Sequence, residues 1–370
     1  MNITYPIVDT AVSLFYSSDS EIPAPKAGDP FYGQDAHYVI NPPSYTDNNN
    51  GTITDNVTGL MWQKDMGQKI SFEDANNKAA GLSPGGYSDW RVPTIKELYS
   101  LILFTGKVQG EKSITLFIDT SYFTQPLGDP KKGEREIDAQ TWSATEYAGK
   151  TMNGDATVFG VNFIDGRIKG YPKFDPRTRA PNKMYFRMVR GNPDYGKNSF
   201  TDNNDGTVTD HATGLMWQKA DSGKGMDWEH ALAYAETLSA AGHNDWRLPS
   251  AKELQSIVDY SRSPQTSNSA AIDPVFAISS ITDPNGKTNY PFFWSSTTHL
   301  DGRDPESHAV YIAFGEAQGQ MRGSVVDVHG AGAQRSDPKS GNPSDYPSYF
   351  GPQGDIRYVF NYIRCVRNVQ

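Results

Sequence analysis

An internal duplication constrains this chain more than any other feature of its sequence. The stretch "YTDNNNGTITDNVTGLMWQK" at residues 45–64 returns as "FTDNNDGTVTDHATGLMWQK" at residues 200–219, with 15 of 20 positions identical. Four further pairs recur in the same order: "GYSDWRVPTIKEL" and "GHNDWRLPSAKEL", "TWSATEY" and "FWSSTTH", "VFGVNFIDG" and "AVYIAFGEA", "YFRMVR" and "YIRCVR". The order and spacing of these blocks predict two copies of a whole domain, because solenoid repeats recur every 20–50 residues or so.

The blocks divide the 370 residues into three parts. Residues 1–44 contain several prolines and are predicted to form an N-terminal extended arm. Residues 45–195 and 196–370 are predicted to be copy 1 and copy 2, each near the commonest domain size. The offset between the copies grows from 155 to 177 residues. Copy 2 is therefore expected to carry an inserted loop at about residues 323–353.

The local patterns within each copy predict an α+β fold, with two helices packed on short antiparallel β-sheets and joined by long loops. Each copy opens with two β-prone runs separated by Asn- and Gly-containing turns, which is typical of hairpins. The second helix of each copy is expected to begin at a capping box, formed by Thr94 with Glu97 and by Ser250 with Glu253.

Tryptophans recur at three equivalent positions in each copy. They lie in apolar or alternating runs, which favours core packing over exposed sugar-stacking rings. They are Trp62, Trp90, Trp142, Trp217, Trp246 and Trp294. Cys365 is the only cysteine, which excludes an intramolecular disulfide, and its strand-like surroundings predict a buried thiol.

The composition and the net charge limit the classes of binding partner that we expect. The formal net charge of −9 argues against nucleic acid as a partner and against an anionic membrane surface. No run is apolar enough to predict membrane insertion. The first residues show neither the basic region nor the apolar region of a signal peptide, so a secreted or cell-surface protein is expected to have lost its signal before this sequence begins.

One stretch of copy 1 is strongly basic. Arg167, Lys169, Lys173, Arg177 and Arg179 follow one another with only Asp175 opposing them. Such a run is most often a solvated face with locally paired charges. The alternative is a patch for an acidic ligand such as a sulfated glycan.

The duplicated opening stretch offers oxygen ligands for a cation. Asp202, Asn204, Asp205 and Asp210 lie within nine residues of one another. An EF-hand loop would place its glycine one residue later and would close with a glutamate, so the pattern favours an Asx-rich hairpin turn. A Ca²⁺ site completed by distant carboxylates is the alternative. It would bind more tightly in copy 2, because Asn50 of copy 1 replaces Asp205.

The inserted segment of copy 2 mixes charged, amide and aromatic side chains, the groups that bind carbohydrate hydroxyls and C–H faces. It is therefore the preferred ligand-binding site, with Asp327, His329, Gln334, Arg335, Asp337, Lys339, Tyr346 and Asp355 as candidates. An ordered loop that covers copy 2 or packs against copy 1 is the alternative. A catalytic or metal-ligating role for His329 with Asp327 would need further groups that the spacing does not supply.

Taken together, "DNNDGTVTDHATGLMWQK", "DWRLPSAKEL", "FWSST" and "YIRCVR" resemble the Lcl C-terminal domain family, named for the C-terminal domain of the Legionella collagen-like adhesin. The resemblance covers roughly residues 45–190 and 200–367. It implies two tandem C-type lectin-like domains, and its best-described member is a secreted adhesin that binds sulfated glycans. The collagen-like segment of that adhesin has no counterpart here.

These observations predict a non-catalytic, adhesin-like protein that is secreted or exposed at the cell surface. Its expected partner is a glycan or a cell-surface protein, recognised mainly through the inserted loop of copy 2. No cofactor is required, Ca²⁺ remains an open alternative, and the sequence does not predict an oligomeric state. An enzyme built around Asp327, His329 and Arg335, or a structural envelope or pilus component, are the alternative functions.

Overall fold

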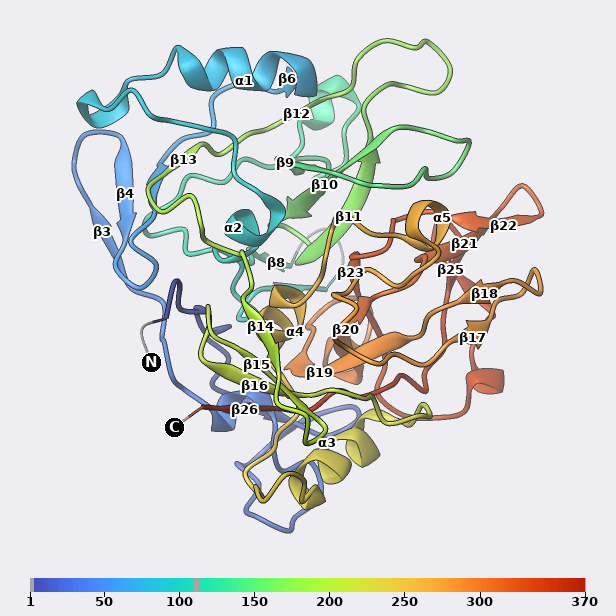
Figure 1. The fold of residues 1–370 in the computed structure, drawn as a ribbon. Coiled ribbons are helices and arrows are strands. Elements are labelled where there is room, and N and C mark those ends of the chain that lie inside the picture. The colour runs from blue at the N-terminus through green and yellow to red at the C-terminus, as the bar shows by residue number, and fades with distance from the viewer. Residues whose placement is uncertain (1–2, 110–112, 370) are drawn as a thin grey trace.

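A computed structural model describes residues 3–109 and 113–369 (Figure 1). At its centre lies one six-stranded antiparallel sheet to which both copies contribute three strands, in the order β19-β20-β23-β11-β10-β9. Copy 1 supplies β9 (Thr141–Glu146), β10 (Thr157–Asn162) and β11 (Arg167–Pro172), and copy 2 supplies β19 (Phe292–Thr298), β20 (His308–Ala313) and β23 (Gln334–Pro338). The mixture of short helices and small antiparallel sheets confirms the α+β class.

In each copy a four-stranded sheet pairs the strands of the first repeated sequence block with a strand of the last block. In copy 1 the order is β13-β5-β4-β3, and in copy 2 it is β14-β15-β16-β26. The strands of copy 1 are β3 (Tyr45–Asp47), β4 (Thr52–Asp55), β5 (Met61–Gln63) and β13 (Val189–Arg190). Those of copy 2 are β14 (Phe200–Asp202), β15 (Thr207–Asp210), β16 (Leu215–Gln218) and β26 (Val366–Asn368). The predicted hairpins are therefore confirmed.

The second helix of each copy begins where its capping box predicts. The longer helices α1 (Phe72–Ala80) and α3 (Trp228–Thr237) lie at opposite ends of the molecule (Figure 1). The short helices are α2 (Ile95–Tyr99), α4 (Ala251–Ser256) and α5 (Pro264–Ser267). Both capping boxes are present at α2 and α4. The glutamate of each box also receives two hydrogen bonds from an arginine, Arg91 in copy 1 and Arg247 in copy 2.

The remaining strands form two-stranded ribbons and one small sheet. The ribbons are β1 (Phe15–Tyr16) with β2 (Glu21–Ile22), β6 (Ile70–Ser71) with β12 (Lys183–Met184), β7 (Lys107–Val108) with β8 (Ile114–Thr115), and β17 (Ile281–Thr282) with β18 (Thr288–Asn289). The small sheet has the order β22-β21-β25-β24, made of β21 (Gln318–Met321), β22 (Ser324–Asp327), β24 (Tyr349–Phe350) and β25 (Asp355–Ile356).

The strands of this small sheet show that residues 323–353 do not form one inserted loop, as the sequence predicted. In copy 1 a four-residue turn, residues 163–166, joins β10 directly to β11. In copy 2 the hairpin β21–β22 enters between β20 and β23, and β24 and β25 follow β23. The extra residues therefore flank a strand of the central sheet. The prediction of a continuous loop was wrong because β23 completes the hydrogen bonding of both β20 and β11.

The two copies meet through matching contacts. Lys96 Nζ donates to the backbone oxygen of Ser256 at 2.6 Å, and Lys252 Nζ donates to that of Ser100 at 2.8 Å. These residues occupy equivalent positions at the short helices α2 and α4, so the contact is reciprocal. The largest hydrophobic cluster also contains side chains of both copies. The predicted boundary near residue 196 therefore separates two sequence repeats that share their largest hydrophobic cluster.

The buried aromatic core follows the repeat. All six repeated tryptophans are at most 4% exposed, and Trp228 is fully buried as well. Cys365 is fully buried, as predicted. The N-terminal arm packs on copy 2, where Tyr38 donates to Glu236 at 2.7 Å and Lys339 donates to the backbone oxygen of Ser17 at 3.0 Å.

Candidate functional site

The two copies form a groove where β11 pairs with β23. Ile168 of β11 pairs with Gln334 of β23. The adjacent residues on the two strands, Arg167 and Arg335, therefore form a neighbouring pair on the opposite face of the sheet. The groove has a volume of about 520 Å³. We call it the seam groove and define it by the lining residues Arg167, Asp301, Tyr311, Arg335, Phe350, Asp355 and Arg357.

The floor of the seam groove is a network of paired charges. Arg167 donates to Asp301 and lies 3.2 Å from Asp165, while Arg335 donates to Asp355. Burial opposes ionisation of Asp355, but the Arg335 guanidinium, the hydrogen bond from His329 and the charge of Lys169 together outweigh it and hold the pKa of Asp355 far below its usual range. The floor therefore carries fixed charges of both signs at neutral pH.

His329 lies behind this floor. Its Nε2 is 2.9 Å from Asp355 Oδ1, and only 2% of the residue is exposed. Burial, together with the positive charge of Arg335, lowers the pKa of His329 to about 4. The imidazole is therefore neutral at pH 7, and its Nε2–H donates to Asp355. His329 supports the position of the carboxylate and does not itself line the groove.

The wall of the seam groove combines an aromatic ring with a free cation. The guanidinium carbon of Arg357 lies 3.5 Å from the ring centroid of Phe350 and 5.9 Å from that of Tyr346. Phe350 remains 51% exposed, and within the described residues Arg357 makes no ion pair. On the floor, Arg335 Nη1 is buried and has no hydrogen-bond partner among these residues. The groove therefore offers the half-exposed Phe350 ring and the guanidinium of Arg357.

The structure brings some predicted ligand-binding residues together and separates others. Arg335, Asp337, Tyr346 and Asp355 all line the seam groove. The basic stretch of copy 1 adds Arg167 to the same groove, a convergence that the sequence did not predict.

The other predicted residues face elsewhere. Asp327 accepts a hydrogen bond from Tyr147 at 2.7 Å, and burial with the nearby Glu316 raises its pKa to about 8. Gln334 is fully buried in β23. Lys339 is buried under the N-terminal arm, 4.4 Å from the Trp228 ring. These three placements contradict the prediction of one inserted loop that forms the site, because the segment is folded into two sheets.

The basic stretch is largely neutralised by local partners. Lys169 lies 3.6 Å from Asp165, and Lys173 lies 2.9 Å from Glu146. Burial and the adjacent Arg335 lower the pKa of Lys169 to about 8. Arg177 and Arg179 are exposed. Paired charges therefore describe the first half of the stretch, and only its last two arginines form an open basic surface.

The Asx cluster of copy 2 has the geometry of a turn. Asp202 accepts the backbone N–H of Asn204 at 3.0 Å and pairs with Lys219 at 2.6 Å, and Asn204 has a positive φ of 59°. Asp205 accepts the N–H two residues further on, while Asp210 is fully buried and accepts other backbone N–H groups. Across residues 3–109 and 113–369, no three His, Cys, Asp or Glu side chains are placed to hold a metal ion.

Four of the residues that define the seam groove were not among the predicted site residues, and one of them, Phe350, lies within the inserted segment. Arg357 directly follows the inserted segment, and its position beside aromatic residues was the available signal. Asp301 and Tyr311 lie outside that segment, in the loop after β19 and in β20. Nothing local marks these two as site residues, because only the pairing of β11 with β23 brings them to the groove.

A known domain family matches both copies. The model of the Lcl C-terminal domain matches residues 51–190 and, a second time, residues 206–329. This chain belongs to the Lcl C-terminal domain family. No curated protein and no solved structure matches it.

Membership of the Lcl C-terminal domain family confirms the tandem arrangement and implies, at the coarse level, an adhesin-like surface protein. Among the described residues no helix has the length and apolar character that crossing a bilayer requires. The second Lcl match ends at His329, so Arg335, Phe350 and Arg357 lie beyond the matched segment. The wall of the seam groove is therefore built by residues that the family match does not include.

Proposed function

We propose that this member of the Lcl C-terminal domain family is a non-catalytic, secreted or surface-exposed adhesin, and that the seam groove binds a glycan. The observation that carries the proposal is the Arg357 guanidinium lying 3.5 Å over the half-exposed Phe350 ring. The part of the Phe350 ring that Arg357 leaves uncovered can stack on the C–H face of a sugar ring, and the guanidinium beside it can bind the hydroxyls and acidic substituents of that sugar.

The charge pattern favours an acidic glycan. Arg357 lines the groove and makes no ion pair within the described residues. Carboxylate and sulfate groups match the planar donor geometry of guanidinium. The proposed C-type lectin-like fold is consistent with this use of a surface built from loops and short strands at the edge of a rigid sheet.

The enzyme alternative depended on Asp327, His329 and Arg335 acting together. His329 and Arg335 meet at Asp355, whereas Asp327 bonds to Tyr147 instead. A nucleophile and its base must lie within hydrogen-bond reach of each other. The contacts of Asp327 and His329 therefore favour binding over catalysis at this site.

Calorimetric titration with a heparin-derived hexasaccharide tests the proposal, with maltohexaose as the neutral comparison. Phe350→Ala and Arg357→Ala should each weaken binding of the sulfated probe about tenfold, the loss of roughly one charge-assisted hydrogen bond or stacking contact. Arg177→Ala is the matched control, because Arg177 is an exposed arginine outside the groove. A loss in Arg177→Ala with no change in the two groove variants would move the site to the open basic surface.

The calcium alternative is tested in the same assay. We propose that titrations in EDTA and in millimolar Ca²⁺ will give the same affinity, because each carboxylate of the Asx turn already has hydrogen-bond partners. A thermal midpoint that rises only with Ca²⁺ would make calcium a ligand of the native protein.

A further inference from the structure

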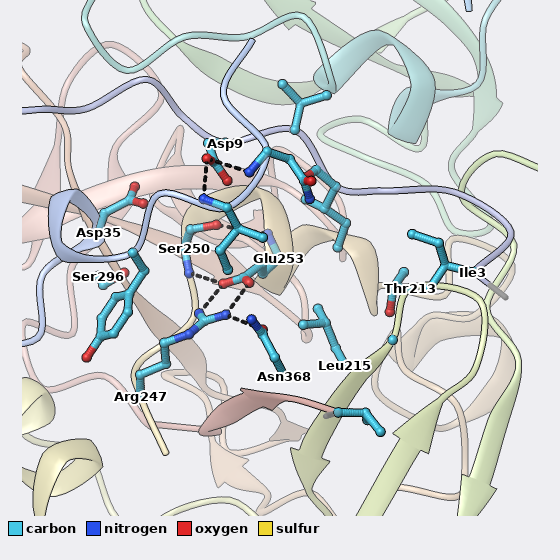
Figure 2. Close-up of a pocket in the computed structure, with 17 residues that line it drawn as sticks. Ile3, Asp9, Asp35, Thr213, Leu215, Arg247, Ser250, Glu253, Ser296 and Asn368 are labelled. Carbon is cyan, nitrogen blue, oxygen red and sulfur yellow. Dashed lines mark hydrogen bonds and ion pairs between the residues drawn. The ribbon is translucent and has the colours of Figure 1, made fainter. Parts of the chain in front are cut away.

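A second cavity lies between the N-terminal arm and copy 2, away from the seam groove (Figure 2). Its volume is about 480 Å³. One part of its wall is aliphatic, formed by Ile3, Ile7, Val8, Ile40, Leu215 and Val369. The polar part contains three carboxylates, Asp9, Asp35 and Glu253, and one guanidinium, Arg247. We call this space the arm cavity.

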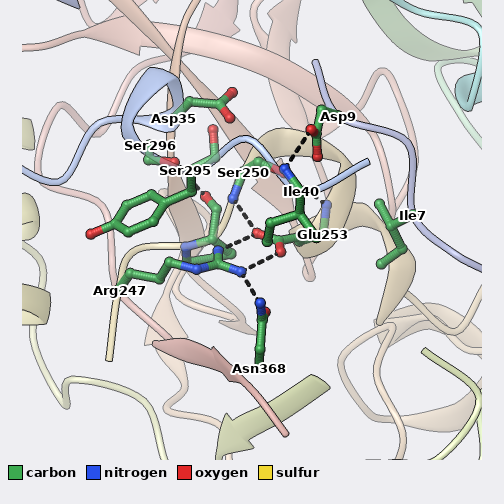
Figure 3. Close-up of polar contacts among 12 residues, drawn as sticks. Ile7, Asp9, Asp35, Ile40, Arg247, Ser250, Glu253, Ser295, Ser296 and Asn368 are labelled. Atoms are coloured by element: carbon green, nitrogen blue, oxygen red, sulfur yellow. Dashed lines mark hydrogen bonds and ion pairs between the residues drawn. The ribbon is translucent and has the colours of Figure 1, made fainter. Parts of the chain in front are cut away.

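The charges of the arm cavity do not cancel. Arg247 donates to both oxygens of Glu253 at 2.6 Å and to Asn368 at 3.1 Å, so this pair neutralises itself (Figure 3). Both close-ups place Asp9 and Asp35 on the same side of that pair. Neither carboxylate forms an ion pair within the described residues. The Lys252 ammonium acts on both carboxylates from a distance but does not line the cavity, so neither has a direct cationic partner there.

Asp35 has an oxygen without a protein partner. Its Oδ2 accepts hydrogen bonds from Thr10 at 2.7 Å and Thr297 at 2.5 Å, whereas Oδ1 receives none among the described side chains. The residue is only 7% exposed, yet it lines the arm cavity. Asp9 likewise uses Oδ2 alone, for the backbone N–H groups of Ile40 and Asn41. Each carboxylate therefore keeps one oxygen that can accept a hydrogen bond from a donor in the cavity.

The surroundings indicate which kind of cation would fit. No three acidic, His or Cys side chains of the described residues are placed as metal ligands. An ammonium group supplies three donors to separate acceptors and needs no closed ligand cage. The adjacent aliphatic wall suits a hydrocarbon chain attached to that ammonium. The combination therefore favours an organic cation over a metal ion.

We propose that the arm cavity is a binding site for a primary ammonium group on a short aliphatic chain, held between the free oxygens of Asp35 and Asp9. The source is either a free small amine or the side chain of a lysine on a partner chain, since both present the same chemistry. The site is separate from the seam groove and does not depend on glycan binding there.

Copy 1 supplies the matched comparison. Thr145 of copy 1 is equivalent to Thr297 of copy 2. Each hydroxyl accepts the backbone N–H of the first residue of the short helix, at 2.9 Å in copy 1 and 3.0 Å in copy 2. The cavity beside Thr145 is lined by the segment 193–200, with Asp259 and Asp273 as its carboxylates. No counterpart of the buried Asp35 lines it. Only the copy 2 cavity is therefore expected to bind the ammonium.

Ligand-observed NMR titration of the full chain tests the site, with n-butylammonium as the probe and n-butanol as its neutral analogue. The wild-type protein should bind n-butylammonium at least about tenfold more tightly than n-butanol. Asp35→Asn should remove that preference, since an amide keeps an acceptor for Thr10 and Thr297 but has no charge. Asp259→Asn, in the copy 1 cavity, should leave it unchanged.

The proposal is overturned if n-butanol and n-butylammonium bind equally to the wild type, or if Asp35→Asn keeps the full preference. Should Asp35→Asn lower the thermal midpoint by many degrees, Asp9→Asn takes its place with the same expected loss. Binding of Nα-acetyl-lysine methylamide supports a lysine side chain as the source, and binding of n-butylammonium alone supports a free amine.

A pH series supplies an independent readout. Burial is the main cause that raises the pKa of Asp35 to about 6, opposed by the hydroxyls of Thr297 and Thr10. The charged or titratable groups around it are Asp9, Glu253, Arg247, Lys252 and Tyr99. Ammonium binding should weaken as the pH falls below about 6 and Asp35 takes up a proton. A flat profile from pH 5 to pH 8 would contradict the role of Asp35.

Discussion

Lys252 holds a buried ammonium at the contact between the two copies, and replacing it tests how that contact is stabilised. Its Nζ donates to the backbone oxygens of Ser100 at 2.8 Å and Asp9 at 3.1 Å, and the residue is 3% exposed. Burial lowers the pKa of Lys252 to about 7, although the nearby carboxylate of Asp55 acts in the opposite direction. In the unfolded chain the same group has its ordinary value of 10.5.

The sign of the effect follows from proton binding. Between pH 7 and about pH 10.5 the unfolded state binds more protons at Lys252 than the folded state, so folding stability rises with pH. Below pH 7 Lys252 is charged in both states, and burying that charge lowers the free energy of unfolding by roughly 5 kcal/mol, at about 1.4 kcal/mol per pH unit. Raising the pH from 7 to 9 should relieve about 2 kcal/mol of that loss.

Lys252→Met removes this titration. Met fills a similar volume but leaves two carbonyl oxygens without a donor, which costs about 1–3 kcal/mol for each group at every pH. Urea unfolding at pH 7 and pH 9 should therefore show that the wild type gains about 2 kcal/mol more than the variant between the two pH values. Lys224→Met, at an exposed lysine, is the control and should follow the wild type.

Equal changes in the wild type and in Lys252→Met would refute the reasoning. That result would mean that water or a structural adjustment keeps the ammonium solvated in the folded state. The reciprocal variant Lys96→Met extends the test, because burial lowers the pKa of Lys96 to about 8. Between pH 7 and pH 9 the free energy of unfolding should again rise more in the wild type than in Lys96→Met.

Two further predictions concern stability. Trp217→Ala should lower the free energy of unfolding by about 3–5 kcal/mol, because the indole is fully buried in the core that both copies share; a loss below about 1 kcal/mol in urea unfolding would contradict that role. Ser250→Ala should cost about 1 kcal/mol, because the hydroxyl caps α4 by accepting the Glu253 N–H; thermal unfolding that leaves the midpoint unchanged would show that the Arg247–Glu253 pair suffices to hold the turn.

The features that could be read from the sequence depend on short stretches of chain. The capping boxes at Thr94 and Ser250 were predicted because a hydroxyl and a glutamate three residues apart satisfy each other's backbone groups in any protein. The turn at Asn204 was favoured because Asn tolerates the positive φ that the hairpin requires. The buried tryptophans followed from their repeated positions in apolar runs.

The candidate sites depended on contacts between distant residues. Arg167 and Arg335 were each singled out, but nothing in either stretch indicates that β11 would pair with β23. The residues of the inserted segment were predicted to form one loop, although β23 takes its middle part into the central sheet. The arm cavity was not predicted at all, since Asp35 becomes a site residue only when the arm packs against Thr297.

The sequence by itself therefore determined the duplication, the α+β class, the family, the hairpins, the helix starts and most of the aromatic core, because each of these follows from local spacing or from direct comparison of the two copies. Only the tertiary structure decided that the copies share one sheet, which charges are paired, and where two cavities open. Those outcomes are set by strand pairing and desolvation across more than a hundred residues of chain, as between Ile168 and Gln334, and such pairings leave no mark in local sequence.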